Sequence, residues 1–269
     1  MNVFEFVPEG IGECSVTAWI HTYPGTGAEP IKHPAIIICP GGGYAHVSAR
    51  EAEPVAKPYF AAGYNIFILN YIVGEQAKDF YPLCQLAATI AHVRKHANEL
   101  NTAADRIAVC GFSAGGHLAA SLGTLYNEPE FLEKFGRTDH IRPDAMILGY
   151  PVITSDEYAH VGSIQKVSGA EKGSEKYAWF GLDKHVDEQT PPAFIWHTAA
   201  DKVVPVENSL KMCMALSAAN VPFEYHVLPT GGHGMSVCTE EVGTPSEYNA
   251  RWMEWSIEWL NQYLGGESE

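Results

Sequence analysis

The chain is poor in positive charge and has no long hydrophobic run. Its 269 residues include 17 Lys and Arg against 32 Asp and Glu, so the formal net charge is −15 at pH 7. This excess disfavours nucleic acid and anionic membrane surfaces as partners, because nothing would neutralise their phosphates. No apolar stretch approaches the roughly 20 residues that a membrane-spanning helix needs. Residues 1–6 lack the basic region and apolar core of a secretory signal, and we expect a cytoplasmic protein.

Patterns typical of disulfide frameworks, metal sites and nucleotide sites are also missing. The six cysteines are scattered along the chain, and two of them lie in predicted buried strands, which is typical of reduced, packed thiols. No cysteine and histidine pairs have zinc spacing. The glycine-rich segments lack both the Gly-Lys-Ser/Thr of a phosphate loop and the G-x-G-x-x-G of a dinucleotide site. We therefore expect neither a metal nor a cofactor.

What the sequence does contain is an alternation of strand and helix patterns through a single domain, residues 1–269. This alternation predicts an α/β fold with a mostly parallel central sheet and helices on both faces. No internal repeat or linker divides the chain. The expected strands are Ser15–Tyr23, Ala35–Cys39, Asn65–Asn70, Arg106–Cys110, Ala145–Gly149, Ala193–Thr198 and Phe223–Leu228.

Two helices are indicated by their apolar periodicity. Apolar residues from Leu83 to Leu100 recur at spacings of three and four, as on one face of a helix. The last helix is expected to begin in the segment 244–247, Thr-Pro-Ser-Glu, which matches a capping box with proline at the first helical position. Four aromatic residues follow at helical spacing, and we expect them to pack in the core rather than to bind sugar. They are Tyr248, Trp252, Trp255 and Trp259.

The pentapeptide of residues 111–115, Gly-Phe-Ser-Ala-Gly, is the strongest functional signal. An apolar strand pattern precedes it and a run of small residues follows, so Ser113 is expected at a sharp turn between a strand and a helix. Such a turn exposes the serine hydroxyl at the carboxyl end of the sheet, where the amides at the start of the helix also point. Ser113 is therefore the predicted nucleophile.

A serine nucleophile needs a base and an orienting acid, which in this fold follow it in the order acid, then histidine. Asp201 comes directly after the predicted strand Ala193–Thr198, and His233 lies in a glycine-rich loop after the last strand. Both are thus expected at the same sheet edge as Ser113. Asp156, which follows the strand at Met146, is a rival for the acid.

Ten of the other eleven histidines lack a suitable position relative to a strand end or lie within helices or strands. The remaining one, His117, follows the nucleophile on the same expected helix and points either toward the site or into packing. His233 is therefore the predicted base.

A third signal is the segment 40–44, Pro-Gly-Gly-Gly-Tyr, which follows an apolar strand. Glycines at this position allow the backbone to approach a ligand closely with its amides turned inward. We expect the amides of Gly42 or Gly43, with that of Ala114, to form an oxyanion hole. A flexible loop without this role is the alternative.

These motifs resemble those of the α/β-hydrolase esterase/lipase family, and within it the bacterial acetylxylan and feruloyl esterases. The resemblance extends over nearly the whole chain, from the glycine loop through the Ser113 pentapeptide to the segment around Asp201 and to Gly232-His233-Gly234. Relatives of hormone-sensitive lipase usually have histidine where this chain has Pro40, which points to the branch similar to carbohydrate esterases.

Residues 155–189 depart from the alternation, and we expect them to form a cap or lid over Ser113. Their aromatic residues Tyr158, Trp179 and Phe180 either stack on a sugar or aryl acid or seal the cap against the body. Tyr44 and His46, beside the glycine loop, are placed to line the acyl pocket.

The resemblance and the ordered residues imply a serine carboxylesterase acting through an acyl-enzyme. Short-chain esters, above all acetyl esters of carbohydrates such as xylo-oligosaccharides, are the expected substrates, so the expected partner is a small-molecule or oligosaccharide ester. A lactonase or an aryl-formamidase-type amidase remains open, because the same triad cleaves those bonds. A binding receptor built on an inactive hydrolase is disfavoured, since both Ser113 and His233 are present.

Overall fold

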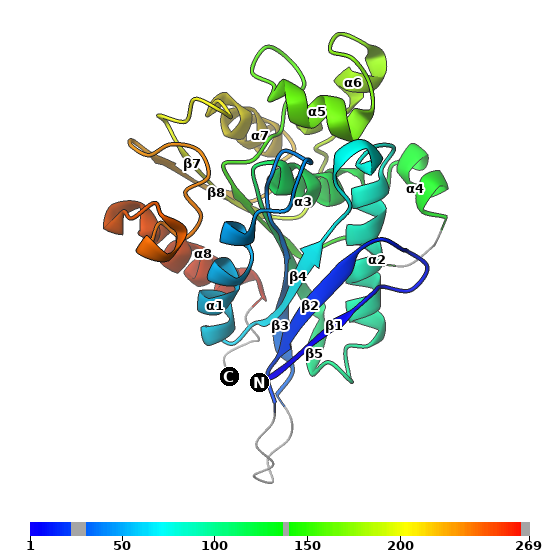
Figure 1. The fold of residues 1–269 in the computed structure, drawn as a ribbon, viewed down its shortest axis with the longest axis vertical. Coiled ribbons are helices and arrows are strands. Elements are labelled where there is room, and N and C mark those ends of the chain that lie inside the picture. Colours follow the sequence, from blue (N-terminus) through cyan, green and yellow to red (C-terminus); the bar gives the residue numbers. More distant parts are fainter. Residues whose placement is uncertain (23–30, 137–139, 265–269) are drawn as a thin grey trace.

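The central sheet runs through the whole molecule and is mostly parallel (Figure 1). The computed structural model describes residues 1–22, 31–136 and 140–264. Eight strands in these residues pair in the order β1-β2-β4-β3-β5-β6-β7-β8, antiparallel at β1–β2 and β2–β4 and parallel elsewhere. The strands are β1 (Asn2–Phe6), β2 (Ser15–Ile20), β3 (His33–Cys39), β4 (Asn65–Asn70), β5 (Thr102–Phe112), β6 (Ala145–Gly149), β7 (Ala193–Thr198) and β8 (Phe223–Leu228). The predicted fold class is confirmed.

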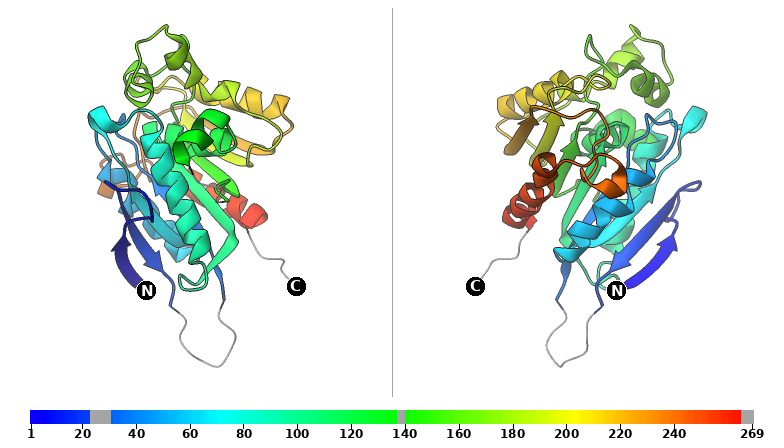
Figure 2. Two further views of the ribbon diagram at one scale, coloured as in Figure 1. Left: turned by 90° about the vertical axis from the view of Figure 1, so that its right-hand side faces the viewer. Right: turned by 60° about the vertical axis from the view of Figure 1, so that its left-hand side comes forward.

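Helices cover both faces of the sheet. In Figure 1, α1 and α8 lie on one side and α2 on the other, while α5 and α6 stand beyond one end of the strands, an arrangement that Figure 2 shows from two further directions. The α-helices are α1 (Glu53–Ala61), α2 (Tyr81–Lys95), α3 (Ala114–Leu125), α4 (Pro129–Phe135), α5 (Val161–Ser168), α6 (Glu175–Trp179), α7 (Glu207–Ala218) and α8 (Glu247–Leu264). Short 3-10 turns are η1 (Ala49–Glu51), η2 (Gly74–Gln76), η3 (Leu182–Lys184) and η4 (Glu240–Val242). None of the helices in the described ranges has the length and apolar character needed to cross a bilayer.

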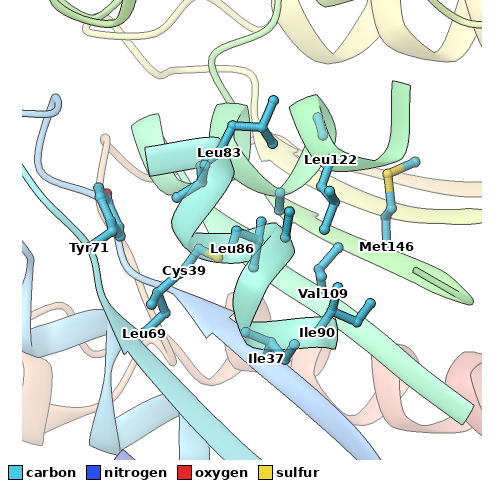
Figure 3. Close-up of a cluster of buried hydrophobic side chains, with 14 of the residues drawn as sticks. Ile37, Cys39, Leu69, Tyr71, Leu83, Leu86, Ile90, Val109, Leu122 and Met146 are labelled. Atoms are coloured by element: carbon cyan, nitrogen blue, oxygen red, sulfur yellow. The ribbon is translucent and has the colours of Figure 1, made fainter. Parts of the chain in front are cut away.

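Two hydrophobic clusters, one on each face, hold these layers together. The side chains of β3 alternate: Ile37 packs with α2 and α3, whereas Ile36 and Ile38 pack with α1 and α8. Figure 3 shows the first cluster, in which Leu86 and Ile90 of α2 lie over β3 and β5. Each fully buried aliphatic side chain of this kind contributes about 1.5–3 kcal/mol. The packing fixes the positions of the strand ends, where the candidate site lies.

Four expected strands have the observed bounds, whereas others differ at their ends. The strand expected at Ala35–Cys39 begins at His33, and the one expected at Arg106–Cys110 extends over Thr102–Phe112. The strand from Ser15 ends at Ile20, and its expected end, Tyr23, lies outside the described residues. Strand β1 was not predicted, because a five-residue edge strand that is largely exposed carries little local pattern and depends on its pairing with β2.

The two expected helices also differ at their ends. Helix α2 stops at Lys95, and the chain continues to Leu100 as turns, in which the Leu100 amide donates to the carbonyl of His96. The capping box was wrong: α8 begins at Glu247, and Ser246 is the residue whose hydroxyl accepts an amide of its first turn.

The aromatic stripe of α8 was predicted as core, and this is confirmed for two of its members. Trp252 and Trp259 are buried, and the Trp252 ring stacks on Trp196 with centroids 4.8 Å apart. Trp255 is partly buried against the same cluster. Tyr248 is 54% exposed, so for this residue the expectation was wrong. It lies one turn before Trp252, at the second position of α8, where its side chain is exposed although it falls on the same helical face.

Candidate active site

Ser113 lies at a strained turn between β5 and α3. Its backbone angles are φ 54° and ψ −119°, a conformation that residues with a side chain rarely adopt. The two glycines of the pentapeptide are required by close contacts: a Cβ atom at Gly111 would overlap the carbonyl oxygen of Gly115, and one at Gly115 would overlap that of Cys39. Strand and helix therefore approach closely enough to hold the serine at the carboxyl end of the sheet.

His233 lies between Ser113 and Asp201 and contacts both. Its Nε2 atom is 2.8 Å from the Ser113 Oγ atom, and its Nδ1 atom is 2.6 Å from Asp201 Oδ2. A carboxylate can only accept, so we assign the proton to Nδ1, which leaves Nε2 to accept the serine proton. The structure thus brings together the three side chains expected as nucleophile, base and acid.

Asp201 is surrounded by donors. Its Oδ1 atom accepts the amides of Val203 and Val204 at 2.8 and 3.0 Å, and its Oδ2 atom also lies 3.3 Å from Nε2 of His197. Burial by itself would raise the pKa of Asp201, but the hydrogen bonds from His197 and His233 outweigh it and hold that pKa well below its ordinary value. The carboxylate therefore stays ionised beside the imidazole.

His197 was not recognised from the sequence as a partner of Asp201. A position within a strand does not indicate a role in the site, yet His197 lies four residues before Asp201, at the same strand end. The rival acid, Asp156, lies elsewhere: its carboxylate is 2.6 Å from the Lys211 ammonium. Asp201 is thus the carboxylate that contacts His233.

The three backbone amides expected to form an oxyanion hole are unpaired among the described residues. Within the described part of the chain, the amides of Gly42, Gly43 and Ala114 make no hydrogen bond. Gly42 and Gly43 have φ of 125° and 63°, and a Cβ atom at Gly42 would overlap the carbonyl oxygen of His46. This loop therefore needs glycine for its conformation and leaves backbone donors unpaired beside Ser113.

The four expected substrate-contacting residues lie in three different environments. His46 is exposed, with its ring beside Gly42. Tyr44 is fully buried, and its hydroxyl is 2.9 Å from Nδ1 of His117. Trp179, Phe180 and Phe80 line a separate cavity of about 630 Å³. Ser113, His233 and Asp201 are not among the residues that line it. Of these four residues, only His46 has an exposed side chain beside the glycine loop.

His117 packs inside the molecule instead of pointing into the site. Burial lowers its pKa to about 4, so the ring is neutral at pH 7. Its Nε2 atom donates to the carbonyl of Phe180 at 3.0 Å, which leaves Nδ1 to accept the Tyr44 hydroxyl. This histidine joins the glycine loop to residues 155–189.

His160 was dismissed by the sequence argument and lies close to the site. It precedes α5, and its Nδ1 atom is 2.8 Å from the hydroxyl of Ser163, which in turn lies 3.9 Å from where a Cβ atom of Gly43 would be. Burial lowers the pKa of His160, and the nearby imidazole of His233, whose protonation would repel a second charge, lowers it further. No local pattern marks this residue, because only the path of 155–189 over the strand ends brings it there.

Comparison with known proteins shows the family to which the chain belongs. The model of the BD-FAE family matches residues 23–216. The chain belongs to the BD-FAE family. It is similar to a solved acetyl ester-xyloside bifunctional hydrolase from Caldicellulosiruptor lactoaceticus, with 35% identity, a TM-score of 0.80, and coverage of 93% of this chain and 88% of that one. This family assignment makes the chain an α/β-hydrolase of the esterase type.

Two further relatives differ in how much of their length is matched. A carboxylesterase from Lactobacillus plantarum superposes with a TM-score of 0.88 at 29% identity, covering 99% of this chain and all 100% of that one. Endo-1,4-beta-xylanase B of Butyrivibrio fibrisolvens is 36% identical over 221 residues, which are 79% of this chain. The chain spans only 34% of that xylanase, so the xylanase as a whole is a poor guide to substrate.

Proposed function

We propose that this chain is a serine esterase that removes short acyl groups, acetyl above all, from carbohydrate or small aryl alcohols. The observation that carries the proposal is the continuous line of hydrogen bonds from Ser113 through His233 to Asp201, at 2.8 and 2.6 Å. The membership of the BD-FAE family and the acetyl ester activity in the name of a relative at 35% identity support it.

The reaction follows from the assignment of the His233 proton to Nδ1, which leaves Nε2 free to accept. The Ser113 oxygen attacks the ester carbonyl carbon while its proton passes to Nε2 of His233. The negative charge that develops on the carbonyl oxygen is received by the amides of Ala114 and of Gly42 or Gly43. His233 then protonates the leaving alcohol, and water, activated by the same imidazole, hydrolyses the acyl-enzyme. Asp201 stays ionised and stabilises the imidazolium.

Residues 155–189 form the alcohol-binding side of the site in this proposal. Helices α5 and α6 stand beyond the carboxyl ends of the strands (Figure 1). Asn208 holds the chain on both sides of the start of the segment, because its side chain accepts the amides of Ile153 and Thr154 and donates to the carbonyl of Tyr158. His160 and Ser163 bring polar atoms to this side. A sugar hydroxyl next to the acetyl group would hydrogen-bond there, near the exposed His46 side chain beside Gly42.

Hydrolysis of p-nitrophenyl acetate by the wild type, Ser113→Ala and Ser121→Ala tests the proposed nucleophile. We expect Ser113→Ala to lose at least about 1,000-fold in kcat and to lose labelling by a fluorophosphonate probe. Ser121, a buried serine of the same helix whose hydroxyl donates to the His117 carbonyl, is the matched control and keeps both. Equal hydrolysis by Ser113→Ala and wild type would disprove the nucleophile.

A panel of substrates then separates the reaction classes. Acetylated xylo-oligosaccharides, feruloyl esters, lactones and formamides are compared by kcat/KM with the same enzyme preparation. Acetylated oligosaccharides are expected to give the highest value. A lactone or a formamide in first place would keep the triad but replace the proposed substrate class.

A further inference from the structure

A second carboxyl group is buried beside the serine, and the reaction described above does not use it. Glu51, the last residue of η1, is only 4% exposed. Its Oε2 atom accepts the amide of Gly41 at 2.7 Å, and its Oε1 atom accepts the hydroxyl of Tyr150 at 2.6 Å. A carboxyl group carries a high cost of burial unless such donors satisfy it. Both donors belong to segments that form the candidate site.

The first donor fixes the glycine loop. A Cβ atom at Gly41 would lie 2.7 Å from Glu51 Oε2 and 3.1 Å from the Ser113 Cβ atom, so the carboxyl group and the serine flank the same α-carbon. The amide of Gly41 is held by Glu51, while the amides of Gly42 and Gly43, next along the loop, remain unpaired among the described residues. The direction of those two amides therefore depends on where Glu51 holds Gly41.

The second donor fixes the histidine loop. The Tyr150 oxygen, which donates to Glu51, also accepts the amide of Ser236 at 3.0 Å. The Tyr150 ring meets the His233 ring edge to face, with centroids 5.1 Å apart and planes at 71°. Burial, and then the charge of Glu51, raise the pKa of Tyr150 well above its ordinary value, so its hydroxyl remains a donor. Tyr150 thus connects Glu51 to the loop of His233 through its hydroxyl and its ring.

We propose that Glu51 is a positioning residue that sets the distance between the glycine loop, residues 40–44, and the loop that carries His233, residues 229–236. It touches no reacting atom; it acts through Gly41 on the amides and through Tyr150 on the imidazole. A carboxyl group suits this task because two donors face it, one at each oxygen. Glutamine has a single acceptor oxygen, so Glu51→Gln leaves either the Gly41 amide or the Tyr150 hydroxyl without its acceptor. The proposal rests on the proposed function of Ser113 and His233.

The test compares Glu51→Gln and Tyr150→Phe with Tyr59→Phe. Tyr59 is as buried as Tyr150 and bonds Ser256 at 2.7 Å, on the α1 and α8 side of the sheet. It therefore matches the loss of a buried hydroxyl without touching either loop. For each variant, kcat and KM for p-nitrophenyl acetate, the rate of fluorophosphonate labelling and Tm are measured.

We expect Glu51→Gln to lower kcat about 10- to 100-fold and the labelling rate to a similar extent, with KM within about twofold, because small displacements of reacting groups mainly affect the transition state. Tyr150→Phe, which removes one of the two connections, is expected to lower kcat by about 3- to 10-fold. The double variant is expected to lose less than the product of the single losses, since both changes break one network. Tyr59→Phe lowers Tm and keeps kcat.

The proposal is overturned if Glu51→Gln lowers Tm as Tyr59→Phe does while kcat is unchanged, or if its whole effect lies in KM. If Glu51→Gln does not fold, Tyr150→Phe against Tyr59→Phe decides the question by the same criteria. Failure of the proposed function is seen separately: Ser113→Ala would then remain active. An inactive Ser113→Ala beside a fully active Glu51→Gln contradicts only the role of Glu51.

Discussion

Nε2 of His233 lies 2.8 Å from Oγ of Ser113, although 120 residues separate them in the chain. The contact exists because β5 and β8 end at the same edge of one parallel sheet and each strand is followed directly by the loop that carries the residue. A hydrogen bond of this length in the resting enzyme means that proton transfer needs no large movement.

Replacing the acid removes the control over the histidine tautomer. We expect Asp201→Asn to lower kcat by about 1,000- to 10,000-fold, because an amide no longer holds the proton on Nδ1 of His233. Steady-state kinetics with p-nitrophenyl acetate measures the loss. Asp156→Asn, which breaks only the ion pair with Lys211, is the matched control and is expected to stay within about twofold. A larger loss of kcat in Asp156→Asn than in Asp201→Asn would show that Asp156, and not Asp201, is the acid that orients His233.

Asp201 also makes stability depend on pH. The pKa of Asp201 is lowered in the folded state, so its ionised form contributes stability that is complete above its unfolded pKa of about 3.9 and is lost as the pH falls toward the folded value. The difference in free energy of unfolding between wild type and Asp201→Asn is therefore expected to shrink below about pH 4. Urea titrations at pH 3 to 7 measure it. A difference that grows on acidification would mean that Asp201 is protonated in the folded protein.

Two neighbouring glycines of the glycine loop, Gly42 and Gly43, differ in what a methyl group would meet. At Gly42 it would overlap the His46 carbonyl, whereas at Gly43 it would make an ordinary contact, 3.9 Å from the Ser163 hydroxyl. We expect Gly42→Ala to lose about 100-fold or more in kcat, because the loop must move its donors. Gly43→Ala keeps its amide and meets no overlap, so only the strain of its positive φ of 63° remains, and it is expected to lose less than about tenfold. Equal losses in both variants would show that the amide directions do not depend on the Gly42 conformation.

His160 and Trp179 lie on two different surfaces of residues 155–189, the first near the glycine loop and the second at the separate cavity. We expect His160→Ala to lower kcat/KM for an acetylated xylo-oligosaccharide about 3- to 10-fold more than for p-nitrophenyl acetate, the effect of one lost hydrogen bond. Because the cavity at Trp179 contains none of the reacting groups, Trp179→Ala is expected to reduce Tm and to leave the ratio of the two kcat/KM values unchanged. A selective loss in Trp179→Ala alone would move the alcohol site to that cavity.

Local pattern and chain order sufficed to predict the positions of Ser113, Asp201 and His233. Strands of a parallel sheet direct their carboxyl ends to one edge, so a residue that directly follows a strand is placed by topology alone. The same reasoning could not identify His197, which lies inside a strand but bonds Asp201, or the bond between Glu51 and Tyr150, which are 99 residues apart. Such pairs depend on side-chain directions after packing, for which the sequence offers no local periodicity.

The aromatic residues show the same division. Periodicity placed Trp252 and Trp259 on the covered face of α8, because burial follows the helical repeat there. Tyr44, Trp179 and Phe180 belong to no such repeat, and only their contacts with His117 and Phe80 show which way each ring points.

The sequence by itself therefore indicated the α/β alternation, seven of the eight described strands and the turn at Ser113. It also placed Ser113, Asp201 and His233 at one sheet edge, since each of these features depends on neighbours a few positions away or on a topological rule. The tertiary structure alone decided which buried groups support them: His197 on Asp201, Glu51 on Gly41 and Tyr150, and His160 above the glycine loop. These contacts join segments whose separation in the chain is unrelated to their distance in space, because close packing of the layers determines which side chains meet.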